Sequence, residues 1–268
     1  MALVTAALFL AAARAQRLVK SLVNEVQLRG RLSQYFPSPV AEALANGEDD
    51  ILGARHQQVA VLFADIRGFT KLAETMSPKG VVDLLTSYRQ RLSQPIIDCG
   101  GFVDKYIGDG LMAVFGAPRT GPRDARNALD CGFSILKAVE DWNRQRAIRH
   151  EQQIDIVVAI HFGHVIAGAL GENTQLEYTV IGDTVNVASR LEELAGEHNV
   201  TLIASEDLLA AAHATPDPVS WKQLKNQALR GRRTPINIFC FQGVSQSVAD
   251  GSLKDRSTAF FPARDRVA

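Results

Sequence analysis

From residue 58 to residue 241, short apolar runs alternate with longer segments that have helical periodicity. The run QVAVLFADI (58–66) is apolar almost to its end, which is typical of a central strand with both faces covered. A helical pattern then starts at Ser77-Pro78 and closes at Gly100-Gly101. Next, GFVDKYIG and LMAVFG flank Asp109 and predict a β-hairpin, because glycine tolerates positive φ and aspartate hydrogen-bonds its own turn.

The rest of this region continues the alternation. Further helices are expected over 121–146 and 183–198. Strand patterns cover 154–170, 178–182, 199–205, 220–225 and 234–241. The first elements follow the order β-α-β-β-α-β, which predicts an α+β fold. We expect a ferredoxin-like sheet with its helices on one face, and extra strands after it.

Two flanking regions differ from this central domain (51–243). Residues 1–50 hold an apolar run (1–13), a helical segment and a short proline-started helix that ends in a polar linker. The run is shorter than the ~20 residues of a membrane span and lacks the basic start of a signal peptide. It fits the end of a truncated span followed by basic residues on the cytoplasmic side, or a buried or amphipathic helix. Residues 244–268 have no periodicity, and we expect a mobile tail.

The amino-acid composition indicates which cellular compartment and which classes of partner to expect. The 29 Lys and Arg residues balance the 29 Asp and Glu residues, so no basic field points to a nucleic acid partner. Cys99, Cys131 and Cys240 have no metal-ligand spacing and fit a reduced chain. We therefore expect a cytoplasmic protein, and attachment to the inner face of a membrane through the N-terminus stays open.

Two carboxylates are the first candidates for a functional site. Asp65 ends the first strand, and in a ferredoxin-like sheet that strand neighbours the hairpin that carries Asp109. Two carboxylates at one apolar edge repel each other, and a divalent cation such as Mg²⁺ relieves the repulsion. The glycine in IRGFT (66–70) lets backbone N–H groups close on an anion. Two plainer interpretations stay open: Asp65 as a helix N-cap, and Asp109 as an ordinary turn residue.

Three segments resemble the catalytic segments of the class III nucleotidyl cyclases, which make cyclic AMP or cyclic GMP: VLFADIRGFT, KYIGDGLMAVFG and YTVIGDTVNVASRLE. The resemblance runs from Gln58 to Phe241. It implies a head-to-tail homodimer with two Mg²⁺ or Mn²⁺ ions in each active site, and each site takes residues from both chains. The implied metal ligands are Asp65, Ile66 and Asp109, with the two carboxylates from one protomer. The implied substrate-binding and catalytic residues are Gly68, Phe69 and Thr70, with Lys105, Thr179, Asn186 and Arg190 from the other protomer.

The expected helix after VIGD supports two of these roles. Asn186 and Arg190 are four residues apart and so lie on one face. The apolar positions point toward the core; they are Val185, Ala188, Leu191 and Ala195. A guanidinium suits the developing charge of a phosphoryl transition state, and Asn186 can hold the ribose.

Base choice is expected to depend mainly on Lys105. A lysine can only donate hydrogen bonds, so it suits the N1 acceptor of adenine and opposes the N1–H of guanine. Thr179 can accept from the 6-amino group. Guanylate-type members of the family usually carry Glu and Cys at these two positions. Threonine, where many adenylate cyclases have aspartate, resembles the subgroup that bicarbonate often stimulates.

The sequence also departs from the family. Many relatives have an arginine where this chain has Val157, so a phosphate contact is missing or supplied elsewhere. Arg232 is the candidate for the pyrophosphate, with Arg233 as its competitor. His161 and His164 are interpreted as packing or edge residues, and neither a histidine nor a third carboxylate presents itself as a general base.

The expected reaction is the conversion of ATP to 3′,5′-cyclic AMP and pyrophosphate, assisted by two metal ions. The alternatives are a guanylate cyclase and a catalytically silent nucleotide-sensing or dimerisation module.

Overall fold

The structure is a computed structural model that describes residues 14, 20, 27, 29–33, 35–171, 176–232 and 234–242. The apolar run 1–13, Arg233 and the expected mobile tail 244–268 lie outside the described residues. In the described part of the chain, no helix is both long and apolar enough to cross a membrane.

The chain forms two compact units, which are residues 1–54 with 168–179, and residues 55–167 with 180–268. In the first unit, helix α2 (Ser38–Ala45) begins directly after Pro37 and carries a second proline in its first turn. A 3₁₀ turn follows at Asp49–Leu52. The short proline-started helix is therefore present as predicted, and the proposed domain boundaries stay a prediction.

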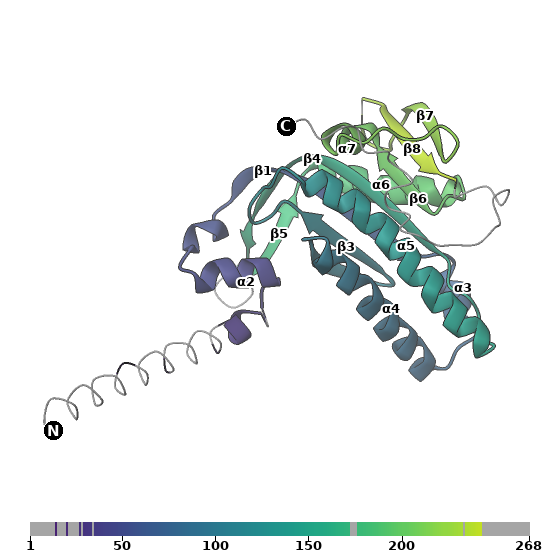
Figure 1. Cartoon of the computed structure of the whole chain (residues 1–268), viewed down its shortest axis with the longest axis horizontal. Coiled ribbons are helices and arrows are strands. Elements are labelled where there is room, and N and C mark those ends of the chain that lie inside the picture. The colour runs from purple at the N-terminus through teal and green to yellow at the C-terminus, as the bar shows by residue number, and fades with distance from the viewer. Residues whose placement is uncertain are drawn as a thin grey trace, which may run out of the picture. The chain divides into compact units, whose positions relative to one another are not determined.

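Among the described residues, eight strands form one mixed sheet (Figure 1). The strands are β1 (Arg55–Ile66), β2 (Phe102–Ile107), β3 (Gly110–Phe115), β4 (Ile156–Leu170), β5 (Glu177–Ile181), β6 (Leu202–Ser205), β7 (Trp221–Gln227) and β8 (Ile236–Phe241). Their order is β2-β3-β1-β4-β6-β8-β7, with β5 paired to β4. The path β2-β3-β1-β4 is the predicted ferredoxin-like arrangement, and the parallel pair β4 and β6 extends it.

The helices between these strands are α3 (Phe69–Glu74), α4 (Pro78–Asp98), α5 (Asp124–Ile148), α6 (Asp183–Glu197) and α7 (Glu206–Ala211). Helix α4 begins where the sequence predicts, because the side chain of Ser77 accepts a hydrogen bond from the N–H of Gly80 at 3.2 Å. Helix α7 was not predicted. Its local signal is Ser205, which caps the helix by accepting from the N–H of Leu208 at 3.1 Å.

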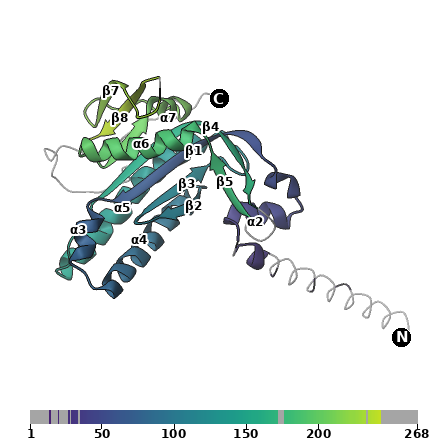
Figure 2. The same cartoon turned by 180° about the vertical axis from the view of Figure 1, so that it is seen from behind.

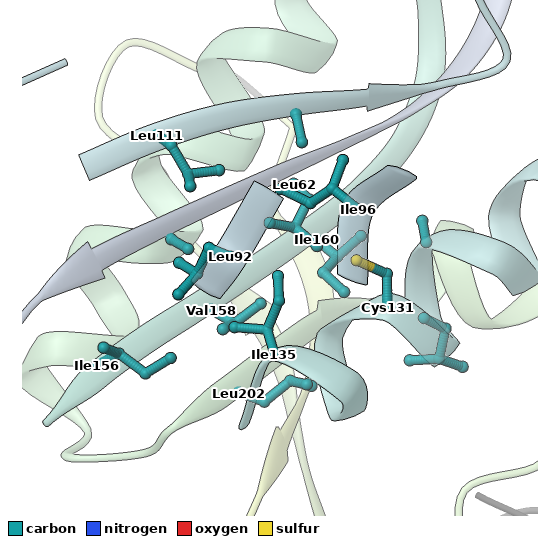
Figure 3. Close-up of a cluster of buried hydrophobic side chains, with 14 of the residues drawn as sticks. Leu62, Leu92, Ile96, Leu111, Cys131, Ile135, Ile156, Val158, Ile160 and Leu202 are labelled. Atoms are coloured by element: carbon teal, nitrogen blue, oxygen red, sulfur yellow. The ribbon is translucent and has the colours of Figure 1, made fainter. Parts of the chain in front are cut away.

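Alternation along β1 sorts its side chains onto two faces. Leu62 and the other even-numbered core residues of β1 pack against α4 and α5, where Leu92, Ile96 and Ile135 meet them (Figure 3). Gly132 of α5 allows close packing on the sheet, since a β-carbon there would lie 2.9 Å from Cδ1 of Ile160 and this side chain would have to shift.

The opposite face of the sheet is covered by α6. Val187, Leu191 and Ala195 of this helix pack against Val157 and Ala159 of β4. The prediction of helices on one face is correct for α4 and α5, whereas α6 lies on the other face, as the two views show (Figures 1 and 2). Odd-numbered residues of β1, including Asp65, consequently belong to the α6 side of the sheet.

Candidate active site

The register of β1 and β3 brings Asp65 to the hairpin that carries Asp109. Ala64 pairs with Leu111, and Gly110 closes the hairpin opposite Ile107. A β-carbon at position 110 would lie 3.3 Å from Oδ1 of Asp65, so the glycine leaves room for this carboxylate. The sequence-based expectation that the strand end approaches the turn is correct.

The two carboxylates interact strongly. The pKa of Asp65 is raised to about 7, first by burial and then by the charge of Asp109 and a hydrogen bond with its side chain. One contact acts in the opposite direction, because the N–H of Ile66 donates to Oδ1 of Asp65 at 2.8 Å. Burial and the charge of Asp109 outweigh this contact and disfavour two negative charges here, and a divalent cation would reverse that preference.

The donor atoms at this edge fit a hard divalent cation. Asp65 and Asp109 offer carboxylate oxygens, and Ile66 can ligate only through its backbone carbonyl. Such oxygen donors suit Mg²⁺ and Mn²⁺ better than softer metals. The described residues contain no cluster of three or more His, Cys, Asp or Glu side chains placed to hold a metal. Further ligands would have to be water or substrate phosphate oxygens, which is the usual arrangement for Mg²⁺ in nucleotide sites.

Sequence reasoning missed two groups around this pair. Glu192 of α6 has a raised pKa, caused by burial and then by Glu193 and Asp109, and its own charge helps to raise the pKa of Asp65. It is a third carboxylate near the pair, where none was expected. Its signal in the sequence is its position two residues after Arg190, on the opposite side of the helix.

Tyr88 of α4 is the second such group. Its side chain is fully buried, and its hydroxyl has no hydrogen-bond partner among the described residues. Burial and then the charges of Asp65, Asp109 and Glu192 raise the pKa of this phenol. Only the packing of α4 against the sheet brings Tyr88 near these carboxylates.

The turn after Asp65 places Gly68 in a left-handed backbone conformation. Gly68 has φ +64°, and a β-carbon there would contact nothing within 4 Å, so the backbone conformation and not space calls for glycine. Helix α3 begins directly afterwards without a side-chain cap. Phe69 is half-buried and Thr70 is exposed. The first N–H groups of a helix have no partners within the helix, so they can serve an anion here.

Helix α6 presents Asn186 and Arg190 away from the core. Asn186 is exposed and Arg190 is half-buried. A β-carbon at position 231 would lie 3.4 Å from Nη2 of Arg190, so this guanidinium lies against Gly231. One predicted core position was wrong: Val185 is only half-buried, and Val187 takes its place in the core because α6 is rotated to present it to β4.

Arg232 is brought to the same region as Arg190. Its Nε lies 3.4 Å from Oδ2 of Asp183, the first residue of α6. Its Nη1 is buried without a hydrogen-bond partner in the described part of the chain. Val157, in contrast, is 3 % exposed and packs under α6, so that position offers no phosphate contact.

The two histidines are packing and edge residues, as interpreted from the sequence. His161 is buried, and its Nδ1 lies 2.8 Å from Oγ of Ser205. Burial and then the charge of Arg232 lower the pKa of His161 to about 4. His164 is exposed, with Nε2 3.1 Å from Nε2 of Gln58.

Lys105 lies in the edge strand β2. It pairs with Met112, which also pairs with Phe63, so Lys105 is on the same face of the sheet as Asp65. Its Nζ lies 3.4 Å from Oδ2 of Asp104, whose carboxylate is fully buried at a β-bulge. Thr179 lies in β5 and is 6 % exposed.

Residues 52–242 match the family model of the adenylate and guanylate cyclase catalytic domain. The chain belongs to this family. Adenylate cyclase 1 of Rhizobium meliloti (strain 1021) is 30% identical over 215 residues, which are 80% of this chain and 32% of the relative. The adenylate cyclase of Anabaena cylindrica is 31% identical over 195 residues, or 71% of this chain and 38% of the relative. The cyclase chain thus spans between 32% and 38% of the length of these two relatives.

Solved cyclase structures agree with the fold. The adenylyl cyclase CyaB from P. aeruginosa has a TM-score of 0.63 and 30% identity, covering 73% of this chain and 98% of that one. The guanylyl cyclase Cya2 has a TM-score of 0.63 and 27% identity, covering 74% and 98%. The predicted family and the mixed α+β fold are therefore confirmed, whereas the Lys/Thr subgroup stays a prediction.

Catalytic domains of the cyclase family use divalent metal ions, bind a nucleotide and work as dimers. Within this cyclase chain, α6 turns Glu192 toward the carboxylate pair and Arg190 toward Gly231. Residues two apart on a helix point about 200° apart, so Arg190 and Glu192 lie on opposite sides of α6.

Proposed function

We propose that this chain is the catalytic domain of an adenylate cyclase that converts ATP to 3′,5′-cyclic AMP and pyrophosphate. The apposed carboxylates Asp65 and Asp109, in a chain of the cyclase family, are the observation that carries this proposal. Relatives that are named adenylate cyclases at 30% and 31% identity support the choice of reaction.

Asp65, Asp109 and the carbonyl of Ile66 would hold two Mg²⁺ or Mn²⁺ ions. When bound, such ions lower the pKa of the ribose 3′-hydroxyl and neutralise phosphate charge. The turn at Gly68, with the backbone of Phe69 and Thr70, would bind phosphate oxygens through N–H groups. These groups orient the triphosphate so that the leaving pyrophosphate lies opposite the 3′-oxygen.

Asn186, Arg190 and Arg232 of the second chain would complete the site in a head-to-tail homodimer. Asn186 would orient the ribose. The 3′-oxygen bonds to the α-phosphorus as the bond from that phosphorus to the pyrophosphate oxygen breaks, and the hydroxyl proton passes to solvent water. Arg190 would stabilise the charge that grows at the α-phosphate, and Arg232 would bind the departing pyrophosphate.

Lys105 and Thr179 would read the base. An ammonium group opposite N1 favours adenine, because N1 of guanine carries a hydrogen. ATP is therefore the proposed substrate, and GTP is the second choice.

The test is to incubate the purified protein with Mn²⁺ and either ATP or GTP and to separate the products. Cyclic AMP from ATP is expected, with Asp109→Asn protein as the matched inactive control. Cyclic GMP as the main product would make it a guanylate cyclase. Binding of nucleotide without any cyclic product would make it a silent module. Adding bicarbonate to the same assay tests the implied stimulation.

Base choice has its own test. The double variant Lys105→Glu/Thr179→Cys places an acceptor opposite N1 and removes the threonine hydroxyl. We expect ATP use to fall at least about 100-fold, because an acceptor would face an acceptor and a buried carboxylate would go unpaired. The ratio of kcat/KM for GTP to that for ATP, at constant Mn²⁺, should rise. An unchanged ratio would show that these residues do not read the base.

A further inference from the structure

Arg67 lies two residues after Asp65 and reaches the end of α6. Its Nη1 donates to Oδ1 of Asn199 at 2.5 Å, and its Nη2 donates to the carbonyl of Ala195 at 3.1 Å and to the carbonyl of Val200. One guanidinium thus binds three oxygens at the C-terminal end of the helix. These oxygens come from residues about 130 positions away in the chain, so no local pattern predicts the contact.

The end of α6 has a defined shape that suits this contact. The N–H of Val200 donates to the carbonyl of Ala195 at 3.1 Å, and that of Asn199 to the carbonyl of Gly196 at 3.2 Å. Asn199 has φ +52°. This is a Schellman closure, in which the last carbonyls carry partial negative charge. A planar guanidinium with several donors matches it well.

Arg67 is also fixed through its backbone. Its N–H donates to the carbonyl of Asp155 at 2.8 Å, and its side chain is half-buried. In the described part of the chain, the oxygens that its guanidinium contacts belong to carbonyls and an amide. Hydrogen bonds to three separate oxygens restrain the position of the guanidinium more than a single ion pair would.

We propose that Arg67 is a positioning residue that holds the metal-binding end of β1 and helix α6 in a fixed relation. The inference rests on the proposed function, in which one chain gives Asp65 to one active site and Arg190 to the other. Arg190 and Ala195 are about 7.5 Å apart along the same rigid helix. Arg67 therefore links Asp65, which binds metal in one active site, to Arg190, which stabilises the transition state in the other active site.

The first test compares single variants. Arg67→Ala is expected to lower kcat about 10- to 100-fold, because a misplacement of about 1 Å costs up to about 100-fold. It should also weaken the rise in melting temperature that Mn²⁺ causes, while the KM for ATP changes less than threefold. Asn199→Gly keeps the backbone conformation but removes one acceptor, so it should give a smaller loss in the same direction.

Arg91→Ala is the matched control. Arg91 is also half-buried, and its Nη2 donates to Oε1 of Gln145 at 3.2 Å, which joins α4 to α5. This variant should lose stability but keep kcat and the response to Mn²⁺. If Arg67→Ala behaved like Arg91→Ala, its role would be structural only and the proposal would be wrong.

The second test uses mixed dimers that contain one complete site. Asp65→Asn chains are mixed with Arg190→Ala chains, and Arg67→Ala is added to either chain. We expect a loss of activity whichever chain carries Arg67→Ala. In one chain the variant would displace the Asp65 of the complete site, and in the other chain it would displace the Arg190 of that site. A loss confined to one placement, or no loss, would overturn the proposed link. Failure of the wild-type protein to make a cyclic nucleotide would instead reject the proposed function itself.

Discussion

Asp65 and Asp109 repel each other in the metal-free protein. Removing one of the two charges should relieve this repulsion. The pKa of Asp65 is about 7 in the folded protein and 3.8 in the unfolded chain. The free energy of unfolding therefore falls as the pH rises from about 4 through 7. At pH 8 without metal, Asp65→Asn and Asp109→Asn should be more stable than wild type. After a discount for the partial exposure of Asp65, the gain is about 1–2 kcal/mol.

Thermal melts with EDTA and with Mn²⁺ measure this prediction. Saturating Mn²⁺ at 100 times its Kd would stabilise wild type by about 2.7 kcal/mol and leave both variants nearly unchanged. Variants that melted below wild type in EDTA would contradict the account of the pair.

At the scale of elements, one buried contact joins β4, β6 and α7. Ser205 caps α7 and also lies against His161, which stays neutral because its pKa is about 4. The unfolded chain takes up this proton near pH 6.5 and the folded chain does not. The free energy of unfolding should therefore fall by about 3 kcal/mol between pH 6.5 and 4 through His161 alone.

His161→Asn isolates this contribution, because Asp65 titrates in the opposite sense over part of the same range. The quantity to measure is the difference between wild type and His161→Asn in urea unfolding at several pH values. It should change by about 3 kcal/mol across the interval. Parallel pH profiles would mean that His161 is not held neutral.

At the scale of the whole molecule, the active site is expected to need two chains. Asp65→Asn protein and Arg190→Ala protein should each be inactive. Mixed in equal amounts, they should recover up to about a quarter of wild-type activity, because half of the dimers then hold one complete site of two. No recovery, with subunit exchange verified by light scattering or tag exchange, would argue for sites built within one chain.

Local patterns were enough to predict the elements that carry the proposed chemistry. The apolar run that ends at Asp65, the glycines around Asp109 and the four-residue spacing of Asn186 and Arg190 are short-range features. Each depends on alternation, turn conformation or helical period, which neighbouring residues determine. The βαββαβ order then placed Asp65 beside the hairpin, because few sheet topologies fit that order.

Packing between distant elements decided the rest. The placement of α6 on the opposite face of the sheet, with Val187 in its core in place of Val185, follows from the shape of β4 and β6 beneath it. The same packing brings Glu192 to the carboxylate pair and the end of α6 to Arg67. Periodicity shows which side of a helix is apolar, but it does not show which strand or side chain that helix meets. Only the tertiary structure determines those contacts, because they join separate elements of the chain, in the case of Arg67 and Asn199 across 132 positions.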